Sequence, residues 1–194
     1  MDISRAELIG TLQKEETGHT RSVHLRMGSI YLIKERKPSL SYRLFEKALS
    51  YGLPGLCVTR QHPNRIGQKF DLPNAKLIWL SQMPGKGNHN PTDIGTLATL
   101  ISSFIEKNKK SISLIDGLEY LVINNGFQQV LKFTELINEQ VMQSESLILI
   151  PISQNAFSDK ELALLERNVE TIEGATIQQA NANRDMAELI DKYR

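Results

Sequence analysis

The chain has 194 residues, of which 40% are hydrophobic and 23% charged, and its formal net charge is +1 at pH 7. These values fit one globular domain with a full core, with or without short terminal arms, and they exclude a disordered chain. The first residues lack the pattern of a secretory signal, and no apolar run reaches the roughly 20 residues that cross a bilayer. A cytoplasmic location is therefore expected.

The first predicted elements alternate between strands and helices. Residues 29–34 (SIYLIK) are rich in β-branched and aromatic residues, which predicts a strand. Residues 40–50 show the apolar spacing of a helix, which Gly52 ends. Two further apolar runs, at 56–59 and 75–81, predict the next two strands.

Two side chains in these strands are assigned to the interior. Cys57 is the only cysteine, so it cannot form an internal disulfide, and its apolar neighbours predict a buried small hydrophobe. Trp79 is likewise predicted to be a core residue.

The next helix is predicted to begin after a polar, glycine-rich loop. Asn90 is expected to cap it, with Pro91 at the first helical position and Asp93 at the third. The helix continues to 106, and the basic run at 107–110 is typical of a helix end, because lysines there complement the helix dipole.

The rest of the chain continues the alternation. It reads as strand, helix, strand, helix and edge strand, at 111–116, 127–142, 146–152, 159–167 and 169–172. Strands separated by helices of this length imply a parallel sheet with right-handed crossovers. The sequence therefore predicts a single α/β domain at 28–174, with a mostly parallel sheet and helices on both faces. An N-terminal arm (1–27) and a C-terminal helical tail (175–194) flank it.

One strand carries a motif with chemistry. The segment SISLID (111–116) is an apolar strand that ends in Asp116, and in P-loop ATPases such a carboxylate holds Mg²⁺ through its water shell. The element order and LIDGLEYL (114–121) resemble the RecA/KaiC-like ATPase core. A simpler alternative is that Asp116 only fixes the turn at Gly117.

Several longer stretches resemble an uncharacterised archaeal domain family whose members often occur beside sensory and kinase modules. The stretches are YLIKERKPSLSYRLFEKAL, GLPGLCVTRQHPNRI, SLIDGLEYLVINNGF and LILIPIS. Together they cover about three-quarters of the chain, residues 28–167. The resemblance implies a RecA/KaiC-like fold and a signalling context, but no reaction.

The sequence departs from an active ATPase at two places. The turn at 35–39 (ERKPS) has no glycine, and Pro38 lacks the amide hydrogen that a phosphate-gripping loop would use. KaiC-like enzymes carry acidic residues after the second strand, where this chain has Arg60 and Gln61. These departures indicate a pseudo-ATPase that is not an enzyme. No cofactor is expected, and because the four histidines lack a tight metal spacing, no metal site is expected either.

Polar residues at the predicted strand ends are candidates for binding a ligand or a partner. They are Arg36, Lys37, Ser39, Arg60, His62, Arg65, Asp116 and Glu119. Purely structural roles remain open for them: a solvated turn with Ser39 as helix cap, a proline-directed helix start after His62, and a turn at Asp116. Asp116 and Glu119 also form a possible carboxylate pair if they share a helical face.

Charge separates the functional hypotheses. Residues 1–76 carry 13 Lys and Arg against 7 Asp and Glu, whereas residues 77–194 carry 10 against 15. The leading hypothesis is a non-catalytic signalling or scaffolding domain that acts through protein–protein contacts, with homo-oligomers implied by the KaiC resemblance. The first alternative is a sensor domain that binds a nucleotide or another anion without hydrolysis. The second is nucleic-acid binding through the basic half, which is the weakest because aromatic residues are not interleaved with the basic ones.

Overall fold

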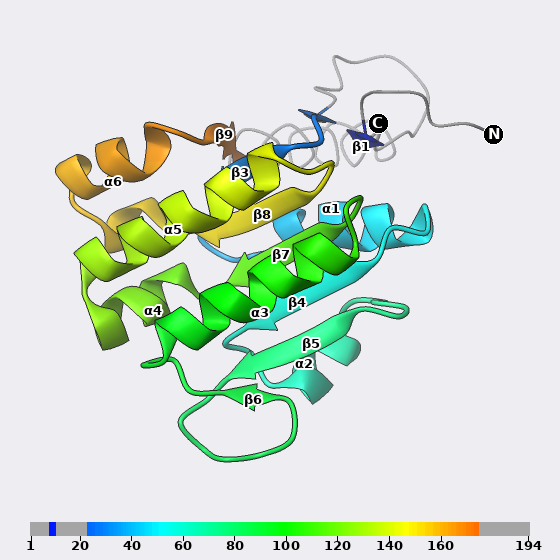
Figure 1. Cartoon of the computed structure of the whole chain (residues 1–194), viewed down its shortest axis with the longest axis horizontal. Helices are drawn as coiled ribbons and strands as arrows, with labels where there is room; N and C mark the ends of the chain where they lie inside the picture. The colour runs from blue at the N-terminus through cyan, green and yellow to red at the C-terminus, as the bar shows by residue number, and fades with distance from the viewer. Residues whose placement is uncertain (1–7, 11–22, 175–194) are drawn as a thin grey trace, which may run out of the picture.

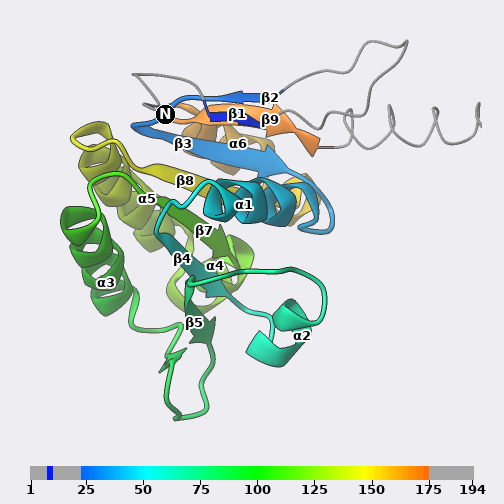
Figure 2. The ribbon, with the colours of Figure 1, turned by 90° about the vertical axis from the view of Figure 1, so that its right-hand side faces the viewer.

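The computed structural model describes residues 8–10 and 23–174. A central sheet lies between two layers of helices (Figures 1 and 2). The sheet has seven strands in the order β6-β5-β4-β7-β8-β3-β9, and each adjacent pair is parallel. The strands are β3 (Ser29–Lys34), β4 (Gly55–Thr59), β5 (Lys76–Leu80), β6 (Asn88–His89), β7 (Ile112–Asp116), β8 (Leu147–Ile152) and β9 (Glu170–Glu173). The predicted α/β class is confirmed.

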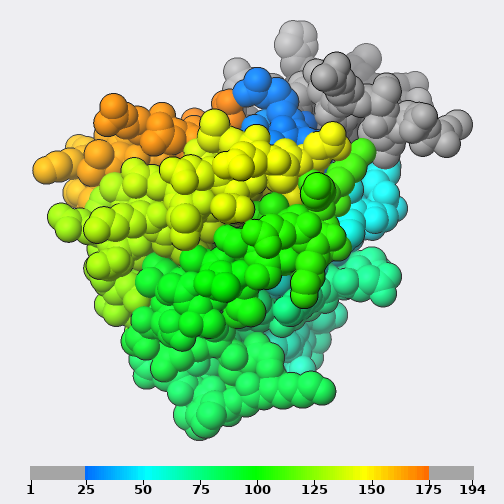
Figure 3. Space-filling view, viewed as in Figure 1, coloured from blue at the N-terminus to red at the C-terminus, as the bar shows by residue number. Residues whose placement is uncertain are grey.

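The helices cover the two faces of the sheet unequally (Figure 2). One face carries α1 (Leu40–Ser50) and the short α2 (Pro63–Gly67). The other carries α3 (Ile94–Lys107), α4 (Leu118–Asn125), α5 (Phe127–Met142) and α6 (Asp159–Glu166). In the space-filling view α3 and α5 close over the sheet (Figure 3).

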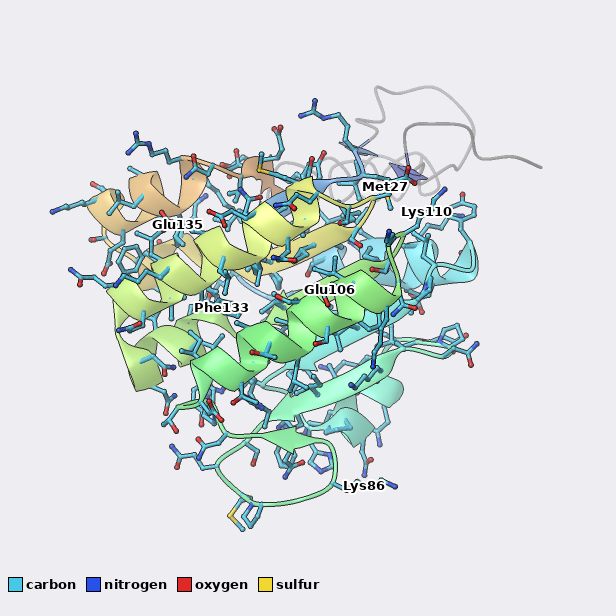
Figure 4. The ribbon with its side chains drawn as sticks, viewed as in Figure 1. Met27, Lys86, Glu106, Lys110, Phe133 and Glu135 are labelled. Carbon is cyan, nitrogen blue, oxygen red and sulfur yellow. The ribbon has the colours of Figure 1, made fainter. Side chains whose placement is uncertain are left out.

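Each face of the sheet has its own hydrophobic core. All six residues of β8 and all five of β4 are buried, as expected for central parallel strands covered on both sides. The helices are two-sided instead: on α5, Phe133 is buried and Glu135 is exposed (Figure 4). Strands buried on both sides are apolar throughout, whereas helices are apolar on one side only. This difference allows strands and helices to be distinguished in the sequence.

Three local predictions need correction. Helix α3 begins at Ile94 with Asp93 as its N-cap, because the Asp93 carboxylate accepts the Thr96 amide, so Asn90 is not the cap. Asn90 instead accepts hydrogen bonds from the amide and hydroxyl of Thr92 in the preceding turn.

The other two corrections concern α4 and Trp79. The eight-residue helix α4 directly follows β7 and was not predicted beyond a possible turn. Trp79 is only partly buried, because β5 has a single short neighbour, β6, on its outer side.

The predicted N-terminal arm contributes a separate two-stranded sheet. From the predicted arm, β1 (Leu8–Gly10) and β2 (Val23–Leu25) form an antiparallel pair. The predicted tail at 175–194 lies outside the described residues, and the domain limits remain a prediction. No helix in the described ranges is long and apolar enough to span a membrane.

Candidate functional site

The carboxyl ends of the parallel strands bring distant parts of the chain together at one edge of the sheet. Open α/β sheets bind their ligands at this edge. A cavity of about 800 Å³ lies here beside the ends of β4 and β7, and we call it the β4–β7 cavity. Its lining residues are Pro38, Arg60, Gln61, His62, Arg65, Lys69, Trp79, Asp116, Gly117, Glu119, Tyr120 and Ser153.

The structure gathers five of the eight candidate residues around this cavity. These five are Arg60, His62, Arg65, Asp116 and Glu119. The other three, Arg36, Lys37 and Ser39, belong to the turn between β3 and α1 and do not line it. Lys86, from the one Gly-Lys pair of the chain, projects from the loop between β5 and β6 (Figure 4).

The Asp116 carboxylate is the centre of a hydrogen-bond network. Its Oδ2 atom lies 2.8 Å from the Tyr42 hydroxyl, 3.1 Å from the Thr59 hydroxyl and 3.0 Å from Gln61 Nε2. Thr59 ends β4 directly opposite Asp116 on β7, which places the two side chains in register. Asp116 therefore joins α1, β4 and the strand exit, which is more than fixing the turn at Gly117.

Burial sets the protonation of the groups beneath this network. Burial raises the pKa of Tyr42, so its hydroxyl stays protonated and can donate to Asp116. The Tyr42 ring stacks on Phe70, with ring centroids 4.5 Å apart. Burial also raises the pKa of the Cys57 thiol to about 12, so Cys57 is an inert buried side chain, as predicted.

A second carboxylate, that of Glu35, fills the start of helix α1. Glu35 Oε2 accepts the amides of Ser39 (2.9 Å) and Leu40 (2.8 Å). Glu35 Oε1 accepts the amide (3.0 Å) and hydroxyl (2.5 Å) of Ser41. The Glu35 side chain is almost completely buried, at 5% exposure.

This arrangement excludes the structural alternative in which the Ser39 side chain caps the helix. Ser39 occupies the N-cap position, but its side chain makes no capping hydrogen bond. The first amides of a helix need acceptors, and a carboxylate there also complements the helix dipole. Glu35, which directly follows β3, provides these acceptors. The first residue of the turn ERKPS therefore caps the helix that the turn leads into.

The basic residues of the cavity all come from the stretch between β4 and β5: Arg60 and His62 precede α2, Arg65 lies on it and Lys69 follows it. The Arg60 guanidinium lies over the Tyr120 ring, 5.0 Å from its centroid, and the Trp79 indole donates to the Arg60 carbonyl at 3.1 Å. The His62 ring meets the Trp79 ring edge-on. His62 also caps α2, its Nδ1 accepting the Asn64 amide. Arg60 and His62 are thereby held in place by aromatic neighbours.

The two acids of the cavity make separate contacts. Glu119 Oε1 accepts the Ser153 amide at 2.7 Å, whereas Asp116 binds the side chains of α1 and β4. They do not act as a pair sharing one hydrogen-bond partner. Among the described residues, no three His, Cys, Asp or Glu side chains gather in a way that could hold a metal ion.

In the described part of the chain, the basic residues of the cavity form no ion pairs. Within residues 8–10 and 23–174 the ion pairs are Arg26–Glu170, Lys34–Glu166 and Lys34–Glu173. None of them involves Arg60, Arg65 or Lys69. The cavity therefore presents cationic side chains without acidic partners in the described part of the chain.

Sequence reasoning missed several residues of this edge. Lys69, Tyr120 and Ser153 line the cavity, and Glu35 and Tyr42 support it. Helical spacing could not have found two of them, because Lys69 lies beyond the end of α2 and Tyr120 lies on α4, which the sequence analysis did not predict.

The fold and this edge define an α/β protein with a parallel sheet, a helix start closed by Glu35 and a cationic cavity. The chain belongs to the family described as "Protein of unknown function (DUF835)", whose model matches residues 34–169. A solved structure from Pyrococcus horikoshii OT3 is similar in fold, with a TM-score of 0.54 and 16% identity. The match covers 78% of this chain and 85% of that one. No curated protein matches the sequence.

Proposed function

We propose that this domain is a non-catalytic signalling or scaffolding domain, a pseudo-ATPase, that acts through contacts with protein partners. The observation that carries the proposal is the Glu35 carboxylate at the start of α1. It accepts hydrogen bonds from amides of the kind that hold phosphate in a phosphate-binding loop. A phosphate at this point would have to displace a buried carboxylate.

Asp116 supports the same proposal. Three side-chain donors already surround its Oδ2 atom, so the waters of a magnesium ion would compete with them for that oxygen. The two residues after β4, Arg60 and Gln61, have no carboxylate that could act as a general base toward an attacking water.

Exposed apolar side chains support protein contacts. Met83 is 69% exposed and Ile123 is 78% exposed. Their sequence neighbours Gln82 and Asn124 are hydrogen-bonded, which places both apolar residues at the same edge of the domain. We propose that these two exposed side chains belong to one contact surface of the domain. A signalling protein or a second copy of the chain is the proposed partner.

Phosphate release from MgATP and MgGTP by the purified protein tests the non-catalytic assignment. We expect no release above that of the matched variant Asp116→Ala, with folding of both proteins checked by circular dichroism. Release by the wild-type protein that disappears in Asp116→Ala would overturn the proposal.

Light scattering tests the contact surface. Wild-type protein is compared with the double variant Met83→Ser/Ile123→Ser, with Met142→Ser, another exposed methionine (68%), as the matched control. We expect self-association in the wild type and in the control, and its loss in the double variant. Equal association in all three proteins would exclude this surface.

A second candidate function is a sensor that binds an anion without hydrolysing it. The specific observation in its favour is the β4–β7 cavity, where Arg60, Arg65 and Lys69 lie without ion-pair partners among the described residues. Its size lies within the range of about 300–1,000 Å³ common for small-molecule sites.

A further inference from the structure

We infer that the β4–β7 cavity binds a small molecule that joins a phosphate or carboxylate group to a flat apolar part. The anionic group would lie on Arg60, Arg65 and Lys69, and the start of α1 would not take part. This inference rests on the second candidate function and names its ligand class and binding mode.

The charge of the cavity favours an anion. Three Lys or Arg side chains and His62 line it, against the two acids Asp116 and Glu119. Both acids already accept hydrogen bonds from their own domain, Asp116 from three side chains and Glu119 from a backbone amide. Both acids thus already accept hydrogen bonds within the domain. The side chains of Arg60, Arg65 and Lys69 line the cavity, where their N–H donors can bind a ligand. Arginine and lysine donors bind phosphate and carboxylate oxygens with charge-assisted hydrogen bonds.

Glu35 excludes the other possible position for the anion. Helix α1 starts next to the cavity, since Pro38 lines it, but the amides of Ser39, Leu40 and Ser41 are already bonded to Glu35. A ligand phosphate in the cavity must therefore use side chains rather than a helix start.

The walls of the cavity favour a ligand larger than a bare anion. Pro38, Trp79 and Tyr120 contribute apolar surface, and the volume of about 800 Å³ exceeds what one phosphate fills. Arg60 is held over Tyr120, so little side-chain freedom is lost when it binds. The arrangement fits an aromatic or similarly flat group that carries the anion.

Trp79 provides a direct readout, because it is the only tryptophan in the chain and it lines the cavity. Its indole N–H gives one signal in a heteronuclear NMR spectrum, which can be followed during titration of the full chain. The probes are phenyl phosphate and inorganic phosphate, without magnesium, and an oligoglutamate peptide. We expect a saturable shift with phenyl phosphate and a weaker affinity for inorganic phosphate.

Two double variants with the same loss of charge locate the anion. Arg65→Gln/Lys69→Gln removes two exposed cavity cations, whereas Arg36→Gln/Lys37→Gln removes two exposed cations outside the cavity. We expect the first to weaken phenyl phosphate binding about tenfold or more and the second to leave the affinity within about twofold. Thermal unfolding confirms that both variants fold.

Three outcomes would overturn the inference: no saturable Trp79 shift at millimolar probe, equal weakening by both variants, or binding of the peptide alone. Equal affinity for phenyl phosphate and inorganic phosphate would contradict the inference that the apolar walls bind the flat part of the ligand. Each of these is distinct from the failure of the non-catalytic assignment, which shows as phosphate release from MgATP. Either result can therefore occur without the other.

Discussion

The start of α1 and the β4–β7 cavity lie side by side at the same edge of the sheet, yet they treat negative charge in opposite ways. At α1 the domain supplies its own anion, because Glu35 accepts four hydrogen bonds from residues 39–41. In the cavity, cations remain without acidic partners among the described residues. The comparison shows that one buried carboxylate satisfies the start of α1, while exposed cations beside it keep no acidic partner among the described residues.

The largest effect is expected at the closed site. Glu35→Ala leaves the amides of Ser39, Leu40 and Ser41 without acceptors in a buried place, which should lower the free energy of unfolding by about 3 kcal/mol. Urea denaturation followed by circular dichroism measures it. Ser39→Ala is the matched control and should cost less than about 0.5 kcal/mol, since that side chain caps nothing. A larger loss in Ser39→Ala than in Glu35→Ala would contradict the assignment of the cap.

A smaller loss is expected where the two regions meet, at Asp116. Asp116→Ala removes the acceptor of the buried Tyr42 and Thr59 hydroxyls and should cost about 2 kcal/mol. In combination with Tyr42→Phe the two losses should not add, because they remove the same hydrogen bond. A double-mutant cycle in urea measures the coupling, and strict additivity would mean that this hydrogen bond contributes nothing.

Gly117 lines the cavity, and replacing it changes the backbone there but not the charge of the cavity. Its φ of +141° is one that residues with side chains rarely adopt, and an added Cβ would lie 3.2 Å from Leu80 Cδ1. Gly117→Ala should therefore cost about 1.5 kcal/mol in urea denaturation. Gly67→Ala on α2 is the control, because nothing lies within 4 Å of its added Cβ and no positive φ is required. It should be neutral or slightly stabilising, so a comparable loss there would show that the effect at Gly117 is not conformational.

The sequence predicted six of the seven strands of the sheet because burial leaves a local pattern, and it missed only the two-residue β6, which lies in the segment predicted as a loop. The run LILIPI of β8 is apolar throughout since both its faces are covered, and the helices show the wider spacing of one-sided burial. Helix α4 was missed because it leaves no such pattern. Its sequence LEYLVINN is short and apolar on most sides, so it carries little periodicity.

The candidate site was only partly predictable, because its contacts depend on the path of the chain. Strand ends identified Arg60, His62 and Asp116, since parallel strands deliver their carboxyl ends to one edge. The Tyr42 hydroxyl reaches Asp116 across 74 positions of sequence, which no local pattern encodes. Residue type also misled: Trp79 was assigned to the core, but it lies beside the cavity at the outer part of the sheet.

The smallest expected effect lies away from both regions, at the cap of α3. Hydrogen bonds from Thr96 hold the pKa of Asp93 below its usual value, so the ionised carboxylate stabilises the fold. A group whose folded pKa is lowered contributes above its unfolded pKa, near pH 4, and the contribution is lost as the pH falls through the folded value. Asp93→Asn should therefore lower the Tm slightly at pH 7, and the difference from wild type should vanish toward about pH 2.

Asn90→Ala separates this cap from the one predicted by the sequence. Asn90 bonds only within its own turn and has no charge, so its effect on the Tm should be the same at both pH values. Thermal melts of the three proteins at the two pH values provide the comparison. If the Tm difference of Asp93→Asn were constant with pH, the ionised carboxylate would not be what stabilises the start of α3. That helix would then differ from α1, whose start depends on the carboxylate of Glu35.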